Sequence, residues 1–439
     1  MTGSGRAAAF VVVGGLTLLG PVVEGTLEGG LKAVVALPFL AVAAVGLLTT
    51  SGPLFELFAR KADRDAGRLY GLAGFALGVA GLGVIAALGS LPMSMFTAAV
   101  FVVTVGNGVQ MLLSGRFSER LFVDTAFVVA GSLGGIGGFA AAGALGAAVP
   151  AIPTVVFVSV GGGLVGGLLR SLLFLHDDPL VVLSVGLVGW FLLGIGVEPT
   201  VTHLTAGIAL TAILGYVAHA LDTASSTGVL TGVLLALFTV ILGGYGWFLL
   251  LVTFFGLGGL SSKYRYEQKL ERGIAEENEG ERGTGNVLAN SAVALVAVVG
   301  FATVDGAVPE TLFQFAFAAA VAAALSDTFS SEFGGLFDNP RLITTGERVP
   351  AGTDGGVTWQ GGVFGLLGAG IIGGLAAIVF GFDTTSTGLV VLAGFFGMVF
   401  DSVLGATLED GLLDNQSVNL LATLAAALLA VVGFTIGLV

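Results

Sequence analysis

Long apolar stretches, separated by short polar segments, make up almost the whole chain. A helix needs about 20 apolar residues to cross a bilayer, so some of these stretches can span directly and others are short, tilted or re-entrant. The pattern predicts an all-α polytopic membrane protein with roughly ten to fourteen transmembrane helices. The apolar stretches lie at 7–23, 31–50, 70–90, 96–113, 121–148, 151–175, 179–196, 201–220, 228–243, 246–260, 287–304, 311–326, 360–380, 387–407 and 417–438.

Basic residues gather in four polar segments between these stretches. By the positive-inside rule, such segments face the cytoplasm. We therefore expect a multi-pass protein of the cell membrane whose charged segments open to the cytoplasm. Most of the 16 lysines and arginines belong to these segments, namely Arg60, Lys61, Arg64 and Arg68, then Arg116 and Arg120, then Lys263, Arg265, Lys269, Arg272 and Arg282, and finally Arg341 and Arg348.

Composition supports the membrane assignment and excludes several other classes. The chain is 55% hydrophobic and 10% charged, and its 73 glycines suit close packing of helices in lipid. Continuous rather than alternating apolar stretches argue against a β-barrel. Cysteine is absent, which excludes disulfides and thiolate metal sites, and no feature indicates nucleic-acid binding. The net charge of −13 is typical of halophile proteins, including archaeal ones, although acidic exposed loops alone would also account for it.

A change in character near 215–228 predicts two regions, 1–215 and 216–439. One interpretation is a pair of degenerate repeats. The segment 102–108 would then correspond to 324–327, and 130–135 to the glycine-rich segment 352–356. Asn107 and Ser132 stand where the first copy would need acids, so we expect the N-terminal region to be a scaffold or a degenerate kinase-like region.

The polar stretch 325–357 lies between two apolar stretches and carries the main candidate chemistry. Ionisable residues at membrane depth are costly, so Asp327 and Glu332 are candidates for binding a substrate or a metal ion. Ser330 and Ser331 can donate to phosphate oxygens on the same turn. A glycine pair at 334–335 and Pro340 predict that the helix ends here. The alternative is a simple cap cluster at a helix end.

Asp354 is the acid of a glycine loop that leads into the apolar stretch 360–380. Glycines let the backbone N–H groups approach a ligand, and a helix N-terminus attracts anions. Gly352, Thr353, Gly355 and Gly356 are therefore candidate phosphate-binding residues. An ordinary Asp-Gly turn is the alternative interpretation.

Other polar residues near or inside apolar stretches complete the candidate site. Asp401 interrupts 387–407, and its carboxylate is costly there unless it has a partner. Asn290 and Asn419 either line a polar cavity or form hydrogen bonds between helices. Lys263 and Lys269 belong to the polar segment 261–286, which would either reach back over the site or remain a solvated loop.

The chain from about Leu221 onward resembles the integral membrane family that includes the phytyl-phosphate kinase of vitamin E synthesis, many of whose members have no assigned function. The first half carries 104–108 and 131–135, which are similar to nucleotide motifs of dolichol and phytol kinases, although Asn107 replaces an expected acid. The resemblance implies phosphorylation of an isoprenyl monophosphate by a nucleoside triphosphate such as CTP. The segments that carry it in the second half are 226–230, 243–247, 262–269, 286–290, 326–334, 340–345, 349–356 and 413–419.

The resulting hypothesis is a membrane-embedded lipid-phosphate kinase that uses CTP or ATP as co-substrate and acts on an isoprenoid lipid phosphate. Mg²⁺ would be held by Asp327, Glu332, Asp354 and Asp401, because phosphoryl transfer depends on positioning and charge neutralisation. Asp327, Glu332, Lys263, Lys269 and Arg341 would be catalytic. The phosphate-binding set would be Ser330, Ser331, Asn290, Thr345, Gly352, Thr353, Gly355, Gly356 and Asn419.

Two other functions fit the same sequence. Two similar halves with intramembrane acids also suit a transporter or flippase, in which case the acids would lie at the membrane midplane. A nucleotidyltransferase that forms a CDP-lipid would instead release pyrophosphate. A kinase requires the acids to gather at one cytoplasmic rim.

Overall fold

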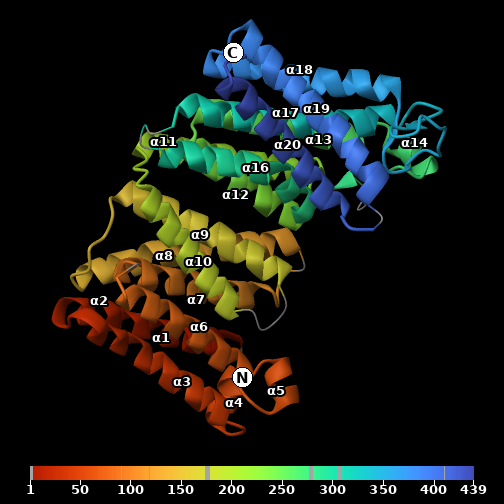
Figure 1. Cartoon of the computed structure of the whole chain (residues 1–439). Helices are drawn as coiled ribbons and strands as arrows, with labels where there is room; N and C mark the ends of the chain where they lie inside the picture. Colours follow the sequence, from red (N-terminus) through yellow and green to blue (C-terminus); the bar gives the residue numbers. More distant parts are fainter. Residues whose placement is uncertain are drawn as a thin grey trace. The chain divides into compact units, whose positions relative to one another are not determined.

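The computed structural model describes residues 3–89, 91–117, 119–173, 178–275, 280–304, 306, 308–409 and 411–439. Within these residues, 14 helices are long and apolar enough to cross a membrane (Figure 1). The chain is therefore an all-α polytopic membrane protein, and the number of spans is at the top of the predicted range. The named strands of the described part form one short antiparallel pair, β1 (Arg341–Leu342) and β2 (Gly356–Val357).

The chain folds into two compact units, Met1–Leu204 and Thr205–Val439. The division falls inside α11 (Val201–Ala220), a short distance before the predicted change at 215/216. Each unit has its own core and is described by itself. The assignment of 1–215 to a scaffold or kinase-like region stays a prediction.

Among its described residues, the first unit has ten α-helices and two short 3₁₀ helices before α11. The first two spans are composite, because Gly5–Thr26 and Gly29–Leu48 each combine 3₁₀ and α turns. The elements are α1 (Gly3–Gly15), η1 (Leu16–Leu18), α2 (Leu19–Thr26), η2 (Gly29–Ala36), α3 (Leu37–Leu48), α4 (Pro53–Phe58), α5 (Lys61–Ala66), α6 (Tyr70–Ala87), α7 (Met93–Leu113), α8 (Arg120–Ala144), α9 (Ile152–Leu172) and α10 (Asp178–Ile195).

An ion-pair cluster holds the helix ends of the first unit together. The buried carboxylate of Asp178, at the start of α10, pairs with Arg60 and, at 2.8 Å, with Arg170 of α9. Asn107 of α7 also donates to Asp178, at 3.4 Å. Asn107 therefore contributes to the packing of α7 against α10.

The segment 130–135 is helical and lies in the middle of α8. Its glycines allow α8 to contact the backbone of α7, since a Cβ on Gly134 would lie 2.6 Å from the carbonyl oxygen of Phe101. The segment 352–356, by contrast, is a loop that precedes a helix. The expected correspondence between these two segments does not hold in their local structure.

The second unit contains the remaining helices and the strand pair. It begins within α11, and its apolar helix α12 is shorter than a typical span. The elements that follow α11 are α12 (Ser226–Leu242), α13 (Tyr245–Lys263), α14 (Tyr266–Glu271), α16 (Thr284–Thr303), α17 (Glu310–Gly334), β1, β2, α18 (Trp359–Phe380), α19 (Thr384–Leu408) and α20 (Asn415–Thr435).

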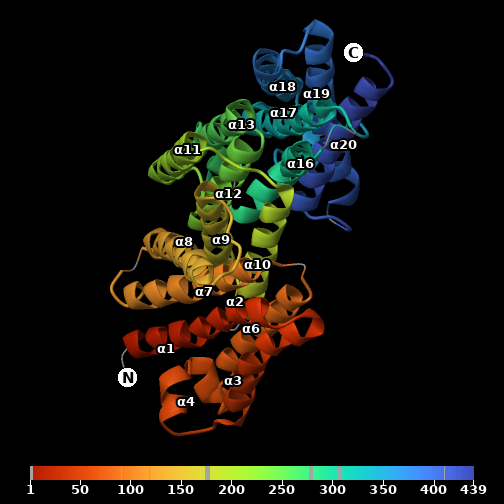
Figure 2. The same ribbon diagram turned by 90° about the vertical axis from the view of Figure 1, so that its left-hand side faces the viewer.

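Helix α17 forms the centre of the second unit and packs against α13, α16, α18, α19 and α20 (Figures 1 and 2). Every residue from Phe317 to Leu325 is buried, and most are alanine. Glycines of the neighbouring helices pack directly on these small side chains. A Cβ on Gly394 of α19 would lie 2.6 Å from Cβ of Ala322, and one on Gly368 of α18 would lie 2.8 Å from the carbonyl oxygen of Leu325. Small residues thus allow close helix approach around α17.

Candidate functional site

Polar segments of the second unit meet where α17 and α19 end and α12, α16, α18 and α20 begin. We call this region the polar rim and define it as the described residues of 221–225, 261–285, 335–358 and 409–414. Contacts between the segments hold it together. Ala224 pairs through its backbone with Arg282, Gly352 lies against Ile274, and Gly285 lies against Gln416. Figure 1 shows α14 beside the loops that precede α18, at the right of the view.

A buried ion pair lies at the centre of the polar rim. Lys269 of α14 is 1% exposed, and its Nζ lies 2.5 Å from Oε2 of Glu332 on α17. The same Nζ donates to the carbonyl oxygens of Ser261, at 2.7 Å, and Ser262, at 3.3 Å, on α13. The ammonium group is therefore well satisfied, and it joins α13, α14 and α17. The structure brings these two predicted catalytic residues together as partners of each other.

Arg282 is a second buried cation of the polar rim, and it is 5% exposed. Its Nη2 donates to Oγ1 of Thr328 on α17 at 3.1 Å, and its guanidinium lies 5.3 Å from the ring centroid of Phe254 on α13. Gly258 leaves room for it, since a Cβ there would lie 3.0 Å from Nη1. Sequence reasoning missed Arg282 as a site residue. The available signal was an arginine placed directly before an apolar stretch.

Asp327 and Asp401 carry the two carboxylates that approach each other between helices. Asp327 is half-buried on α17, and Asp401 of α19 interacts electrostatically with it and with Glu409. Oδ2 of Asp401 is buried without a hydrogen-bond partner. Both aspartates lie within two turns of their helix ends, about 10 Å deep, and so near the polar rim rather than at mid-helix.

Glu332 and Asp354 do not join this carboxylate pair. Glu332 is paired with Lys269, whereas Asp354 is exposed and its backbone lies near Gly405 of α19. Among the described residues, no three Asp, Glu, His or Cys side chains group closely enough to hold a metal ion. The predicted four-carboxylate metal set is therefore not gathered into one cluster.

The glycine loop 352–356 packs against α19 and is stabilised by its own turns. Gly355 has φ +71°, and a Cβ there would lie 2.4 Å from Cβ of Ala406. The N–H of Gly356 donates to the carbonyl oxygen of Thr353 at 2.8 Å, and Oγ1 of Thr353 donates to that of Pro350 at 2.9 Å. Thr358 caps α18 by accepting from the N–H of Gly361 at 3.1 Å. A phosphate cradle at Gly352, Gly355 and Gly356 stays a prediction.

Several further candidate residues lie on the outer surface of the polar rim. Arg341 and Thr345 are exposed on the β1–β2 hairpin, where Nη1 of Arg341 donates to the carbonyl oxygen of Gly346 at 2.6 Å. Ser331 is also exposed and donates to the carbonyl oxygen of Asp327 at 3.0 Å. Ser330 and Lys263 are half-buried at the ends of α17 and α13. The structure does not bring the hairpin residues to the carboxylate pair.

Asn290 and Asn419 are buried on α16 and α20, which pack together. Nδ2 of Asn290 donates to the carbonyl oxygen of Asn286 at 3.0 Å, and Nδ2 of Asn419 donates to Oδ1 of Asn415 at 3.2 Å. These bonds stay within one helix each. Asp414 caps α20, and the hydrogen bonds it accepts from Ser417 hold its pKa below the usual value.

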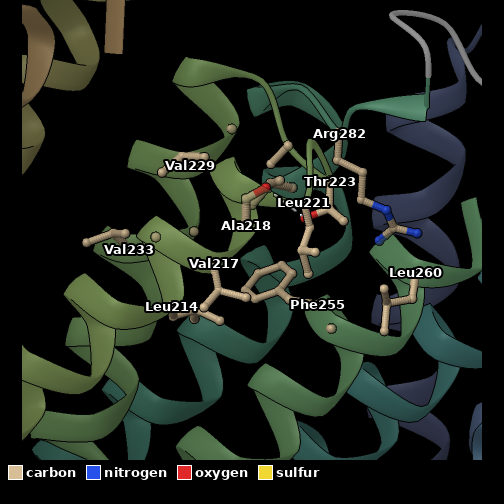
Figure 3. Close-up of a pocket in the computed structure, with 16 residues that line it drawn as sticks. Leu214, Val217, Ala218, Leu221, Thr223, Val229, Val233, Phe255, Leu260 and Arg282 are labelled. Carbon is tan, nitrogen blue, oxygen red and sulfur yellow. Dashed lines mark hydrogen bonds between the residues drawn. The ribbon is translucent and has the colours of Figure 1, made fainter. Parts of the chain in front are cut away.

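An apolar cavity of about 180 Å³ borders the polar rim (Figure 3). Its walls come from α11, α12, α13 and α16, with Val217, Val233 and Phe255 among the lining side chains. Thr223 and Arg282 form its polar border, and Figure 3 shows the side chain of Arg282 running from that border away from the cavity centre. The guanidinium therefore lies between the cavity and α17. No local sequence pattern predicts this cavity, because residues from four helices form it.

Comparison with known proteins places most of the second unit in one family. The family model described as "Integral membrane protein DUF92" matches residues 209–427. An uncharacterized membrane protein of Methanocaldococcus jannaschii, MJ0933, is 33% identical over 238 residues, which cover 53% of this chain and 94% of that protein. No solved structure matches the chain.

Two further relatives come from photosynthetic organisms. Protein VTE6, a chloroplastic protein of Arabidopsis thaliana, is 29% identical over 213 residues, covering 47% of this chain and 64% of that protein. The uncharacterized membrane protein sll0875 of Synechocystis is 33% identical over 203 residues, covering 44% of this chain and 76% of that protein.

Proposed function

Because the chain belongs to the integral membrane protein DUF92 family, we propose that it is a membrane-embedded kinase that transfers a phosphoryl group from CTP or ATP to an isoprenyl monophosphate. The observation that carries this proposal is the set of charged groups at and just inside the polar rim. Lys269 is paired with Glu332, Arg282 is bonded to Thr328 and borders an apolar cavity, and Asp327 and Asp401 face each other between α17 and α19. The resemblance of the second-half motifs to the family that includes phytyl-phosphate kinase supports the same substrate class.

The acceptor of the proposed reaction is the phosphate oxygen of the lipid. This oxygen attacks the γ-phosphorus of the nucleotide, and the bond from that phosphorus to the β–γ bridging oxygen breaks. The products are a nucleoside diphosphate and an isoprenyl diphosphate. Such a transfer needs positioning and neutralisation of charge, and no covalent enzyme intermediate.

Arg282 would offset the negative charge that accumulates when two phosphate groups approach, whereas the charge of Lys269 is already balanced by Glu332. Arg282 reaches α17 at Thr328, the residue that follows Asp327 in the chain. Lys269 keeps Glu332 paired and fixes α14 against α17. Lys263 and Arg341 lie farther out on the polar rim, where their role would be to attract the nucleotide.

Asp327 and Asp401 are the residues that would hold Mg²⁺. This ion is commonly bound through one or two carboxylates together with substrate phosphates, so two aspartates suffice. The buried Oδ2 of Asp401 lacks a hydrogen-bond partner, which fits a carboxylate that is completed by a cation. When bound, Mg²⁺ supplies charge neutralisation for the nucleotide phosphates.

The proposed orientation places the polar rim in the cytoplasm of a cell membrane. Every lysine and arginine of the second unit belongs to the polar segments 261–286 and 335–358. The positive-inside rule puts such segments on the cytoplasmic side, where nucleoside triphosphates are present. The rim position of the aspartates favours this function over a transporter with acids at the membrane midplane.

The test is lipid mass spectrometry after incubation of the purified full chain with Mg²⁺, CTP or ATP, and geranylgeranyl or phytyl phosphate. We expect isoprenyl diphosphate to form, and its rate to fall at least about a hundredfold in Asp327→Asn, a loss of ~2.7 kcal/mol in transition-state stabilisation. Asp338→Asn, an exposed position on the polar rim, is the control and should retain activity.

Other products would identify another function. Formation of a CDP-lipid with release of pyrophosphate would indicate a nucleotidyltransferase. The proposal would be contradicted if neither nucleotide yields a phosphorylated product although thermal unfolding shows that the protein is folded. Full turnover in Asp327→Asn would remove this residue from the mechanism.

A further inference from the structure

The cavity beside the polar rim has the size and lining of a binding site for a hydrocarbon chain. Its volume of about 180 Å³ exceeds the roughly 150 Å³ of an apolar cavity that admits benzene. Nearly all of its lining is aliphatic or aromatic, and Arg282 is the charged member of that lining among the described residues. A cavity of this size holds part of a long chain and leaves the rest between membrane helices.

Two glycines keep this space open. Gly232 of α12 and Gly256 of α13 line the cavity, and a Cβ added to either residue would meet no described atom within 4 Å. Gly228, by contrast, lies against the backbone of Arg282, where a Cβ would be 2.1 Å from the carbonyl oxygen. Gly228 is thus required for close packing against Arg282, whereas Gly232 and Gly256 leave space that no side chain of the protein fills.

Arg282 connects the cavity to the carboxylate-bearing helix. Its backbone belongs to the cavity border, through the bonds it makes with Thr223, at 3.1 Å, and Ser225, at 3.2 Å. Its guanidinium reaches Thr328 on α17. The guanidinium lies beyond this border (Figure 3), toward α17, so a ligand with its apolar chain in the cavity would meet a buried positive charge where an anionic head extends past the border. Guanidinium groups bind phosphate well because their N–H groups match its oxygens.

We propose that this cavity binds the isoprenoid chain of the acceptor lipid, with Arg282 holding its phosphate at the cavity border. The proposal rests on the proposed function for the identity of the lipid, and it adds the location of the acceptor site and the residues that select the chain. Arg282 binds the substrate, and Gly232 and Gly256 set the width of the space available to its hydrocarbon.

The experiment measures binding without nucleotide, so it is independent of turnover. The purified full chain in detergent is titrated with geranylgeranyl phosphate and, separately, with geranylgeraniol, and binding is followed by native mass spectrometry. Gly232→Leu and Gly256→Leu fill the cavity from two different helices, α12 and α13. Gly370→Leu on α18 is the matched control, because a Cβ there also meets nothing within 4 Å but the residue lies outside the cavity.

We expect Gly232→Leu and Gly256→Leu each to weaken binding of both lipids at least about tenfold, and Gly370→Leu to leave it within about threefold of the original chain. Arg282→Gln should weaken binding of the phosphate at least about tenfold but leave the alcohol unaffected, and Arg282→Lys should restore part of the loss. Thermal unfolding of each variant identifies any loss that is due to misfolding.

Unchanged affinity in both cavity-filling variants would overturn the proposal. Equal losses for phosphate and alcohol in Arg282→Gln would also contradict it, since a phosphate ligand must depend more on the charge. If binding behaves as expected but no phosphoryl transfer occurs, the lipid site stands and the kinase assignment fails. If transfer occurs but the filled cavity has no effect on binding, the kinase stands and the acceptor site lies elsewhere.

Discussion

Lys269 and Glu332 show how strongly single side chains of the polar rim depend on each other. Both are buried, and their charged atoms lie 2.5 Å apart with two carbonyl oxygens completing the shell of the ammonium. Removing one member leaves the other charged and buried. Breaking a buried pair in this way typically costs about 3–5 kcal/mol, more than the pair itself contributes over an apolar replacement.

We therefore expect Lys269→Met to lower the free energy of unfolding by about 3–5 kcal/mol and Glu332→Gln to lower it similarly. The double variant Lys269→Met/Glu332→Gln should lose less than the sum of the two single losses. Thermal or denaturant unfolding in a fixed detergent measures all three. Additive losses would show that the two groups do not depend on each other.

These residue-scale features were only partly accessible from the sequence. The candidacy of Lys269 and Glu332 followed from their position beside apolar stretches, but their pairing did not, because 63 residues separate them. The same holds for Asp327 and Asp401, which come from α17 and α19. Contacts between distant segments depend on how the helices pack, and no local pattern encodes that packing.

At the scale of elements, the apolar stretches predict the spans well because each must cover the same bilayer thickness. The glycine pair at 334–335 also predicts the end of α17 correctly. Shared glycines misled the comparison of 130–135 with 352–356, because 130–135 lies within α8, as its place in the apolar stretch 121–148 predicts. In water a glycine cluster favours a turn, but between membrane helices it allows backbones to approach, and the two uses look alike in a sequence.

Helix α18 offers a matched test of glycine-mediated packing. Gly368 lies against α17, where a Cβ would be 2.8 Å from the carbonyl oxygen of Leu325, whereas a Cβ on Gly370 meets nothing within 4 Å. Gly368→Ala should destabilise the protein by about 1–3 kcal/mol through overpacking. Gly370→Ala should be neutral or stabilising by up to ~1 kcal/mol, because alanine favours the helix. Equal unfolding temperatures for the two variants would contradict this account of the α17–α18 contact.

At the scale of the whole molecule, the polar rim, the cavity and the helix core around α17 all belong to the second unit. The family match at 209–427 lies within the same unit. MJ0933, of which 94% is covered, shows that a related protein consists almost entirely of this part. We therefore expect the second unit to fold by itself and to contain the proposed lipid site.

A chain shortened to residues 199–439, which keeps α11 complete, should insert into membranes, unfold cooperatively and bind geranylgeranyl phosphate within about threefold of the full chain. Size-exclusion chromatography in detergent and native mass spectrometry measure this. A shortened chain that aggregates, while the full chain stays monodisperse, would show that the first unit is required for the fold of the second.

Helix α17 runs without a break from the alanine-packed core to the charged end of the second unit. Asp327, Thr328 and Glu332 must therefore keep their mutual spacing whenever the protein rearranges, since moving one of them would require sliding the whole helix past five neighbours. Any rearrangement around a bound nucleotide would then fall to the parts that the core does not hold, namely the hairpin of β1 and β2 and the last turns of α19. The residues of α17 are thus held in fixed positions by the membrane core, and the segments that can change conformation lie at the membrane surface.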